Sequence, residues 1–243
     1  KRQVIDMRYM FNGAIAFNQN ITTNGNNWNT AAVIDMSSMF ANAAAFNQNI
    51  SNWDTSSVID MSGMFYGAAA FNQNINGWDT AAVTNMSSMF KDTTLTNATI
   101  SGWDTAAVTD MTGMFNRAAA FNQNISGWDT AAVENMNSMF KNATAFNQSL
   151  TWTISGQCFS FFAMFKNATS FNGTLTWIQA TGGAPVHLNG AQMFYGATNF
   201  TGLGLPGWQG TGLVRRLGNL NGMFKDASAF AADLSDWLSL IHI

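Results

Sequence analysis

Two rows of aspartate recur along the chain at a spacing that could bind metal ions. The first row places one aspartate in every 25 residues, at Asp54, Asp79, Asp104 and Asp129. Calcium takes about six to eight oxygen ligands, so carboxylates on neighbouring repeats could hold it between them. The competing interpretation is structural, because an aspartate before a turn or helix caps free backbone amides. We expect capping and no metal or other cofactor, and calcium bound at this row is the alternative.

The other reactive side chains are few and scattered. His187 and His242 are the only histidines, and no matched nucleophile accompanies either of them. Cys158 is the single cysteine, and its apolar neighbours predict a buried free thiol. The chain has no Cys-x-x-Cys pair and no glycine-rich phosphate loop after a strand. We therefore expect a protein that is not an enzyme.

Composition narrows the classes of partner. Charged residues make up 9% of the 243 residues, against roughly 25% in an ordinary soluble domain. The surface must therefore consist largely of Asn, Gln, Ser, Thr and Gly. The net charge is −3 and the nearest approach to a basic patch is Arg215-Arg216, so no nucleic-acid partner is expected. No run of about 20 apolar residues exists, so no membrane span is expected in this segment.

A repeated block must position these rows. Each copy carries Met-x-x-Met-Phe or a relaxed form of it, and five successive steps are 25 residues long. Strict spacing of this kind predicts stacked coils, which form a solenoid. We expect one solenoid domain over 1–243, with regular coils over about 28–150 and degenerate coils over 151–243, cut from a longer chain. The nine copies end at Phe11, Phe40, Phe65, Phe90, Phe115, Phe140, Phe165, Phe194 and Phe224.

Within one coil, the apolar spacing predicts two short elements. Val58, Met61, Met64 and Phe65 share one face of a helix over roughly 56–66, either α or 3₁₀. The segment 70–75 predicts a short strand, in which apolar residues alternate with polar ones. We expect equivalent strands, beginning near Phe46, Phe71, Phe121 and Phe146, to pair as parallel neighbours on one face of the stack. The fold class is thus an α/β repeat solenoid of about nine coils, with strands on one face and helices on the other.

Four rows of larger side chains, of Met, Phe, Trp and Gln, must also be placed within the coils. The Met and Phe rows share a face with Val and are expected to form the core. The tryptophan row, which includes Trp78 and Trp103, is expected to stack at a coil corner, with sugar-binding platforms as the alternative. Simple alternation places Gln48, Gln73 and Gln123 on the apolar side. They must either form a stacked amide ladder or be turned outward by a bulge.

The repeat closely resembles that of the BspA-like leucine-rich-repeat surface proteins. The shared unit is Trp-Asp-Thr, then Met-x-x-Met-Phe, then Phe-Asn-Gln-x-Ile, and it is clearest in 53–75, 78–90 and 103–125. The resemblance implies an extracellular or surface-displayed leucine-rich-repeat-like solenoid used in adhesion or protein–protein contact. This family offers no catalytic residues that could be assigned to positions of this chain. The copy at 86–103 departs from the unit, because Leu95-Thr96 replaces Phe-Asn, and copies after 150 lose the Asp-Thr pair.

We therefore expect a non-enzymatic repeat scaffold that contacts a protein or glycan. The alternative is an architectural component of a filament, sheath, capsid or cell-surface structure that packs through its faces and ends, by self-assembly or within a larger complex. If the chain is secreted by a eukaryote, Asn97 and Asn199 are the better candidates for glycosylation. The candidate interaction rows are the asparagines that follow the strand phenylalanines, at Asn47, Asn72, Asn122 and Asn147.

Overall fold

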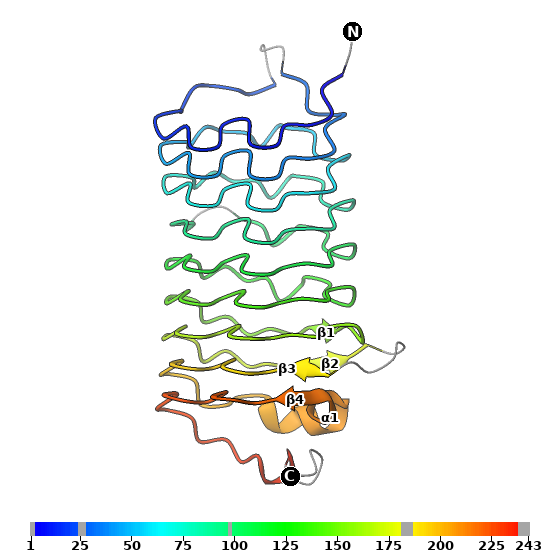
Figure 1. Ribbon diagram of the computed structural model, residues 1–243, viewed down its shortest axis with the longest axis vertical. Helices are drawn as coiled ribbons and strands as arrows, with labels where there is room; N and C mark the ends of the chain where they lie inside the picture. The colour runs from blue at the N-terminus through cyan, green and yellow to red at the C-terminus, as the bar shows by residue number, and fades with distance from the viewer. Residues whose placement is uncertain (1–2, 24–27, 97–98, 181–186, 238–243) are drawn as a thin grey trace.

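The computed structural model describes residues 3–23, 28–96, 99–180 and 187–237. The chain winds into a tall stack of coils, with its two termini at opposite ends of the long axis (Figure 1). Backbone hydrogen bonds join residues about one repeat apart: the Met36 amide donates to the Asp60 carbonyl, and the Met61 amide to the Asn85 carbonyl. The repeat in the sequence is therefore also the unit of stacking.

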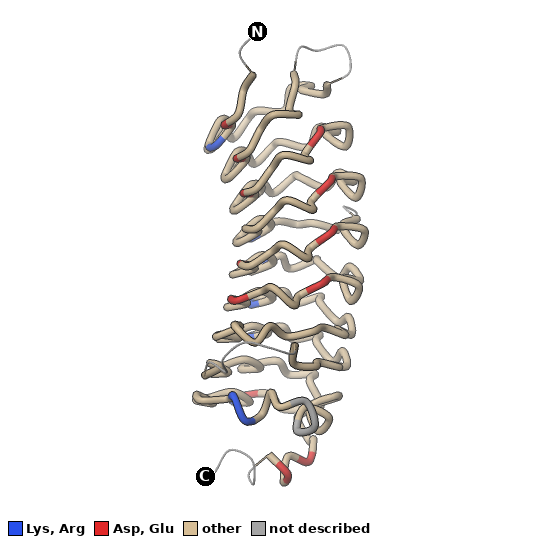
Figure 2. Tube along the Cα trace, turned by 90° about the vertical axis from the view of Figure 1, so that its right-hand side faces the viewer, with Lys and Arg blue, Asp and Glu red and all other residues tan. Residues whose placement is uncertain are grey.

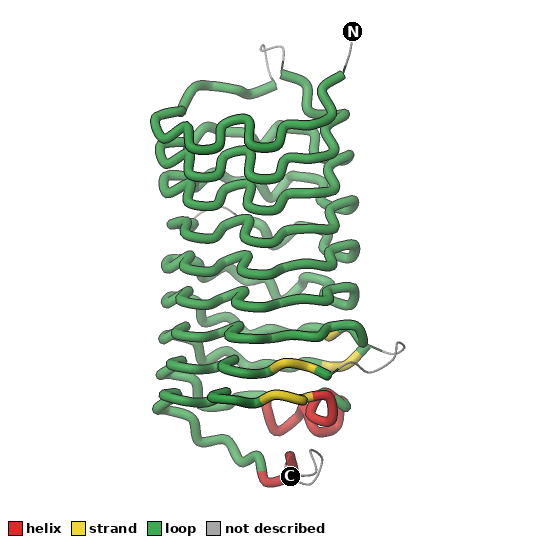
Figure 3. The backbone as a smooth tube through the Cα atoms, in the orientation of Figure 1, coloured by secondary structure: helices red, strands yellow, loops and turns green. Residues whose placement is uncertain are grey.

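The predicted helix over 56–66 is wrong. Residues 56–57 and 62–66 form tight turns, and an isolated parallel bridge at Asp60 lies between them. Figure 3 shows this stretch and its equivalents as loop. The amides of Met61, Gly63, Phe65 and Gly67 donate to the next coil. Between them, the Met64 and Tyr66 amides bond carbonyls three residues back, and the Ser62 amide bonds the Asp60 side chain. We call this stretch, 61–67 and its equivalents, the ladder segment.

The ladder segment departs from a helix because two of its residues adopt left-handed backbone angles. Gly63 has φ of 59° and Gly67 has φ of 66°, whereas the equivalent Ser38 and Asn42 have 53° and 58°. A left-handed residue breaks an α-helix, and glycine and asparagine adopt that conformation at the least cost. The spacing of the apolar residues resembles that of a helix, because successive tight turns also place these side chains on the core side of the coil.

Regular elements are few and short. Two parallel pairs join β1 (Thr153–Ile154) to β2 (Ile178–Gln179) and β3 (Leu188–Asn189) to β4 (Leu217–Asn219). A 3₁₀ helix η1 (Leu205–Thr211) and the one-turn α1 (Leu213–Arg216) occupy the later coils. Isolated parallel bridges begin each ladder segment, and they run through Asp6, Asp35, Asp60, Asn85, Asp110, Asn135, Ser160 and Asn189.

The predicted parallel strands near Phe46, Phe71, Phe121 and Phe146 are also wrong over most of their length. Side-chain amides replace the backbone pairing there: the Asn72 amide donates to Asn47 Oδ1 at 3.0 Å rather than to a carbonyl. Gln73 is half-buried, and its Nε2 donates to both oxygens of Asn47. The glutamines therefore bond the residue immediately before their copy in the preceding coil, not the copy itself, so they do not form the buried ladder of stacked glutamines that was one of the two expected solutions. In the segment after Phe146, Leu150 does form a parallel bridge, with Leu175.

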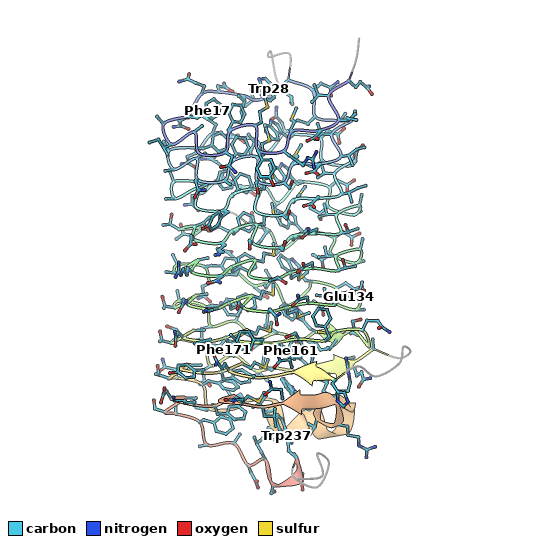
Figure 4. All side chains as sticks on the ribbon, in the orientation of Figure 1. Phe17, Trp28, Glu134, Phe161, Phe171 and Trp237 are labelled. Carbon is cyan, nitrogen blue, oxygen red and sulfur yellow. The ribbon has the colours of Figure 1, made fainter. Side chains whose placement is uncertain are left out.

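The core is built from columns of identical side chains (Figure 4). The phenylalanines that end each Met-x-x-Met-Phe block stack with ring centroids 5.3–5.8 Å apart from Phe11 to Phe224. In each coil that has a second phenylalanine, its ring stacks beside the first, as Phe71 does with Phe65 at 3.9 Å. Met61, Met64 and Val58 are fully buried around them. The prediction of a Met and Phe core is confirmed.

Candidate functional site

The tryptophan row is part of the core and offers no platform for a sugar. Trp78 is 3% exposed and Trp103 is 4% exposed. The Trp78 indole nitrogen donates to the Ile50 carbonyl at 3.0 Å, and Trp103 repeats this bond with Ile75. The indole therefore satisfies a carbonyl of the previous coil while its ring fills the corner. Structural stacking is confirmed for these two residues.

The first aspartate row lies at the exposed corners of the coils, and Figure 2 shows it as one of two acidic edges of the stack. Each carboxylate caps its own turn: Asp79 Oδ1 accepts the Ala81 amide at 3.0 Å, and Asp54 Oδ1 accepts both the amide and the hydroxyl of Ser56. The Ser56 hydrogen bonds hold the pKa of Asp54 below its ordinary value. This is the capping geometry that the sequence predicts.

Calcium at this row stays a prediction that melting can test. Within the described ranges, no group of three or more His, Cys, Asp or Glu side chains lies close enough to form a metal site. Because Asp54, Asp79, Asp104 and Asp129 each already accept a backbone amide, we expect the same melting temperature in calcium and in chelator. A calcium-dependent rise that is lost in Asp79→Asn and Asp104→Asn would favour a bound cation instead.

The second aspartate row consists of Asp35, Asp60 and Asp110, each of which directly precedes a ladder segment. Its side chains accept the amide two residues on, as Asp60 Oδ1 does from Ser62 at 2.7 Å. Asn85 lies between Asp60 and Asp110 in the stack, and its Nδ2 donates to Asp60 Oδ2 at 3.2 Å. Alternating amides with carboxylates therefore avoids placing two negative charges on adjacent coils over this part of the stack.

The candidate asparagine row is engaged within the stack. Asn47 Oδ1 accepts from Asn72 and Gln73, and Asn122 Oδ1 accepts from Asn147 at 2.9 Å. Thr96 replaces the asparagine in the deviant copy, and its amide still donates to Asn72 Oδ1. These oxygens hold one coil to the next, so a ligand role for the row stays a prediction.

A polar hollow of about 410 Å³ lies beside that row, between two coils. Amide and hydroxyl groups line it, and Gly77 leaves its rim open, because an added Cβ would meet nothing within 4 Å. Exposed amides both donate and accept hydrogen bonds, so such a surface can bind hydroxyl groups or peptide groups. The lining residues are Asn49, Ser51, Gln73, Asn74, Asn76 and Gly77.

Of the two candidate glycosylation sites, Asn97 lies outside the described residues. Asn199 is exposed and in a turn, where a glycan would have room, and its modification stays a prediction. Cys158 is buried, and burial raises the pKa of its thiol to about 12. The burial confirms the predicted buried free thiol. His187 is exposed.

The Arg215-Arg216 pair is not a basic patch. Arg215 is exposed, whereas Arg216 is 4% exposed. The Arg216 guanidinium donates to the carbonyls of Ser155, Gly156 and Cys158. Arg216 thus satisfies three carbonyls of an earlier coil instead of facing a partner, and burial lowers its pKa.

Sequence reasoning missed a row of cations. The residue after each Met-Phe pair is lysine in four coils, at Lys91, Lys141, Lys166 and Lys225. These lysines are far apart along the chain, so no local cluster reveals them. Aligning the repeats and comparing the position after Met-Phe would have found the row.

Comparisons with known proteins agree with the repeat architecture. No curated protein matches the chain. Within the described residues, the structure contains no helix of the length and apolarity that crossing a bilayer requires. One family model matches three times, over residues 1–99, 72–178 and 188–239. These matches span most of the chain, which therefore belongs to the repeat family described as "Mycoplasma protein of unknown function, DUF285".

Proposed function

We propose that the chain is a leucine-rich-repeat-like solenoid, displayed outside the cell or on its surface, that binds a protein or a glycan without catalysis. The observation that carries this proposal is the polar hollow over Asn49–Gly77. Stacked phenylalanine rings in the core and hydrogen bonds between the two coils hold the backbone that carries these amides. The amides of the hollow are therefore held in fixed positions. Fixed polar groups bind without a large ordering cost.

Two further observations support an extracellular role for such a surface. The low charge and the abundance of exposed amides and hydroxyls give a face that offers hydrogen bonds rather than ion pairs. The resemblance to BspA-like surface proteins implies the same class of contact, and membership of a repeat family fits a scaffold. Repetition also suits multivalent binding, in which several weak contacts act together.

Blocking the hollow tests the proposal. The intact chain is screened against an array of matrix proteins and glycans, and its tightest ligand is measured by titration calorimetry. Gly77→Arg fills the rim of the hollow, and we expect it to weaken that binding at least about tenfold. Gly127→Arg is the matched control, since a Cβ at that glycine also meets nothing within 4 Å and Gly127 does not line the hollow.

Three outcomes are informative. Equal binding by Gly77→Arg and Gly127→Arg would show that the ligand contacts a surface other than the hollow. An array without any ligand at micromolar concentration would contradict the binding role. Reversible growth of the intact chain into long assemblies, seen by analytical ultracentrifugation, would favour the architectural alternative.

A further inference from the structure

The cations of this chain gather along one edge of the stack. Lys91, Lys141, Lys166 and Lys225 follow their Met-Phe pairs directly, and Arg117 lies one position later in its own coil. Five of the ten lysines and arginines therefore lie either directly after a Met-Phe pair or one residue further on. We call these five residues, together with Tyr66 and Tyr195 at the same position, the basic column.

Backbone hydrogen bonds place these residues on successive coils. The Arg117 amide donates to the Lys141 carbonyl at 2.8 Å, and the Asn142 amide to the Lys166 carbonyl at 2.8 Å. The Asn167 amide continues to the Tyr195 carbonyl, and the Gly196 amide to the Lys225 carbonyl. Lys141, Lys166, Tyr195 and Lys225 are thus in register on four successive coils. Asn116 holds the same position in the preceding coil, where Arg117 lies one residue further on.

The tyrosine rings hold several of the ammonium groups. Lys91 Nζ lies 5.1 Å from the Tyr66 ring centroid, and Lys166 Nζ lies 4.4 Å from that of Tyr195. Lys225 Nζ approaches the Tyr195 ring from the following coil at 5.5 Å. Cation–π contacts fix these charges at the surface without neutralising them. Lys166 Nζ also donates to Gln192 Oε1 at 2.8 Å, which is a neutral partner, so these ammonium groups keep their charge for an anion.

Hydroxyl groups lie next to these charges. A hollow of about 260 Å³ opens beside Tyr66 and Lys91. Its remaining lining comes from the ladder segments of three successive coils, at Ser38, Ser62, Gly63, Ser87 and Ser88. A ligand here would meet both a cation and neutral hydrogen-bonding groups.

Part of the basic column places like charges on adjacent coils. Lys141 and Lys166 lie on adjacent coils, and like charges that close repel each other even when exposed. In one acidic row, Asn85 separates Asp60 from Asp110. The other row has no such alternation, and its carboxylates instead each accept a backbone amide. Within the described residues, the carboxylate paired with the column is Asp92, at 3.6 Å from Arg117. An external anion would relieve the repulsion.

We infer that the basic column binds a linear anionic polysaccharide, whose carboxylates or sulfates meet the ammonium groups and whose hydroxyls meet the serines. A linear polymer matches a straight column that follows the long axis. A net charge of −3 and two acidic edges disfavour duplex DNA, which carries one negative charge per about 1.7 Å. The inference rests on the proposed binding role and adds a second surface and a chemical class of partner.

Heparin, a sulfated polymer of uronate and glucosamine, is the probe. We expect calorimetry to show binding that weakens as salt rises, because exposed charges are screened. Lys141→Gln with Lys166→Gln removes two adjacent charges and should weaken binding at least about tenfold. The matched control, Arg8→Gln with Arg215→Gln, removes the same charge from exposed positions outside the column and should leave the affinity within about threefold. Melting curves check that both variants are folded.

Each outcome decides between the claims. Equal loss in the two double variants would overturn the column as the site, since bulk charge alone would explain the binding. Equal or tighter binding of a single-stranded DNA of matched charge would overturn the polysaccharide class. If heparin fails to bind while the array ligand still binds and Gly77→Arg still weakens it, the column inference fails and the proposed function stands. If neither ligand binds, the proposed function itself fails.

Discussion

Phe115→Ala should cost about 3–5 kcal/mol of unfolding free energy, the usual range for removing a fully buried phenylalanine. Phe115 is 0% exposed. Its ring lies 3.8 Å from that of Phe121 and 5.8 and 5.7 Å from those of Phe90 and Phe140. The stacked neighbours cannot collapse into the cavity without losing their own register. Urea unfolding followed by tryptophan fluorescence measures the loss.

The control for this experiment is the same substitution at the surface. Phe159 is 45% exposed, so Phe159→Ala should cost less than about 1 kcal/mol. Stacked repeats do not always unfold in a single transition, so the slope of the urea curve must be compared as well as the midpoint. A similar loss in the two variants would mean that the aromatic column is not the main source of stability.

Gly173→Ala should destabilise the chain by about 1–3 kcal/mol, the range for forcing extra volume into a packed region. A Cβ at Gly173 would lie against the backbone carbonyl of Gln148, far inside van der Waals contact. The coils come close at this point because the Leu150 amide donates directly to the Thr174 carbonyl at 2.9 Å. Neither backbone can withdraw without breaking that bond. Thermal unfolding with matched urea titrations measures the cost.

Gly77→Ala provides the comparison for Gly173→Ala. A Cβ at Gly77 would meet nothing within 4 Å, so the substitution should be neutral or stabilise the chain by up to about 1 kcal/mol through the unfolded state. If Gly173→Ala were no more destabilising than Gly77→Ala, that result would contradict the close contact between Gly173 and the Gln148 carbonyl. The equivalent positions in earlier coils carry glutamine, as at Gln73 and Gln123. The exchange to glycine thus accompanies a change from side-chain to backbone pairing.

The stacking of repeats could be predicted from the sequence, because the period of 25 residues is explicit and the apolar positions recur within it. The core could be predicted for the same reason: Met61, Phe65 and Trp78 are all buried. Capping by Asp54 and Asp79 followed from chemistry local to one turn. Each of these conclusions depends on residues close together in the sequence or on exact repetition.

The conformation inside each coil could not be predicted from the sequence. Apolar offsets near Met61 fit a helix as well as they fit alternating tight turns, and only the left-handed angles at Gly63 and Gly67 separate the two. The strand after Phe71 failed because Asn47 Oδ1 takes the place of a backbone carbonyl, a choice made between coils. The cation row was missed for a related reason. Lys141 and Lys166 become neighbours only through the stacking.

The ladder segments have a consequence for how such a chain can change over evolutionary time. Each segment donates amides to the coil that follows and offers carbonyls to the coil that precedes, in the same register, as Met36, Met61 and Met86 do. Gaining or losing one 25-residue unit would therefore preserve the pattern of backbone hydrogen bonds between the remaining coils. Copy number can vary by duplication of whole units, while point substitutions at exposed positions such as that of Lys91 alter what the surface recognises. The length of the stack and its binding specificity can thus evolve independently.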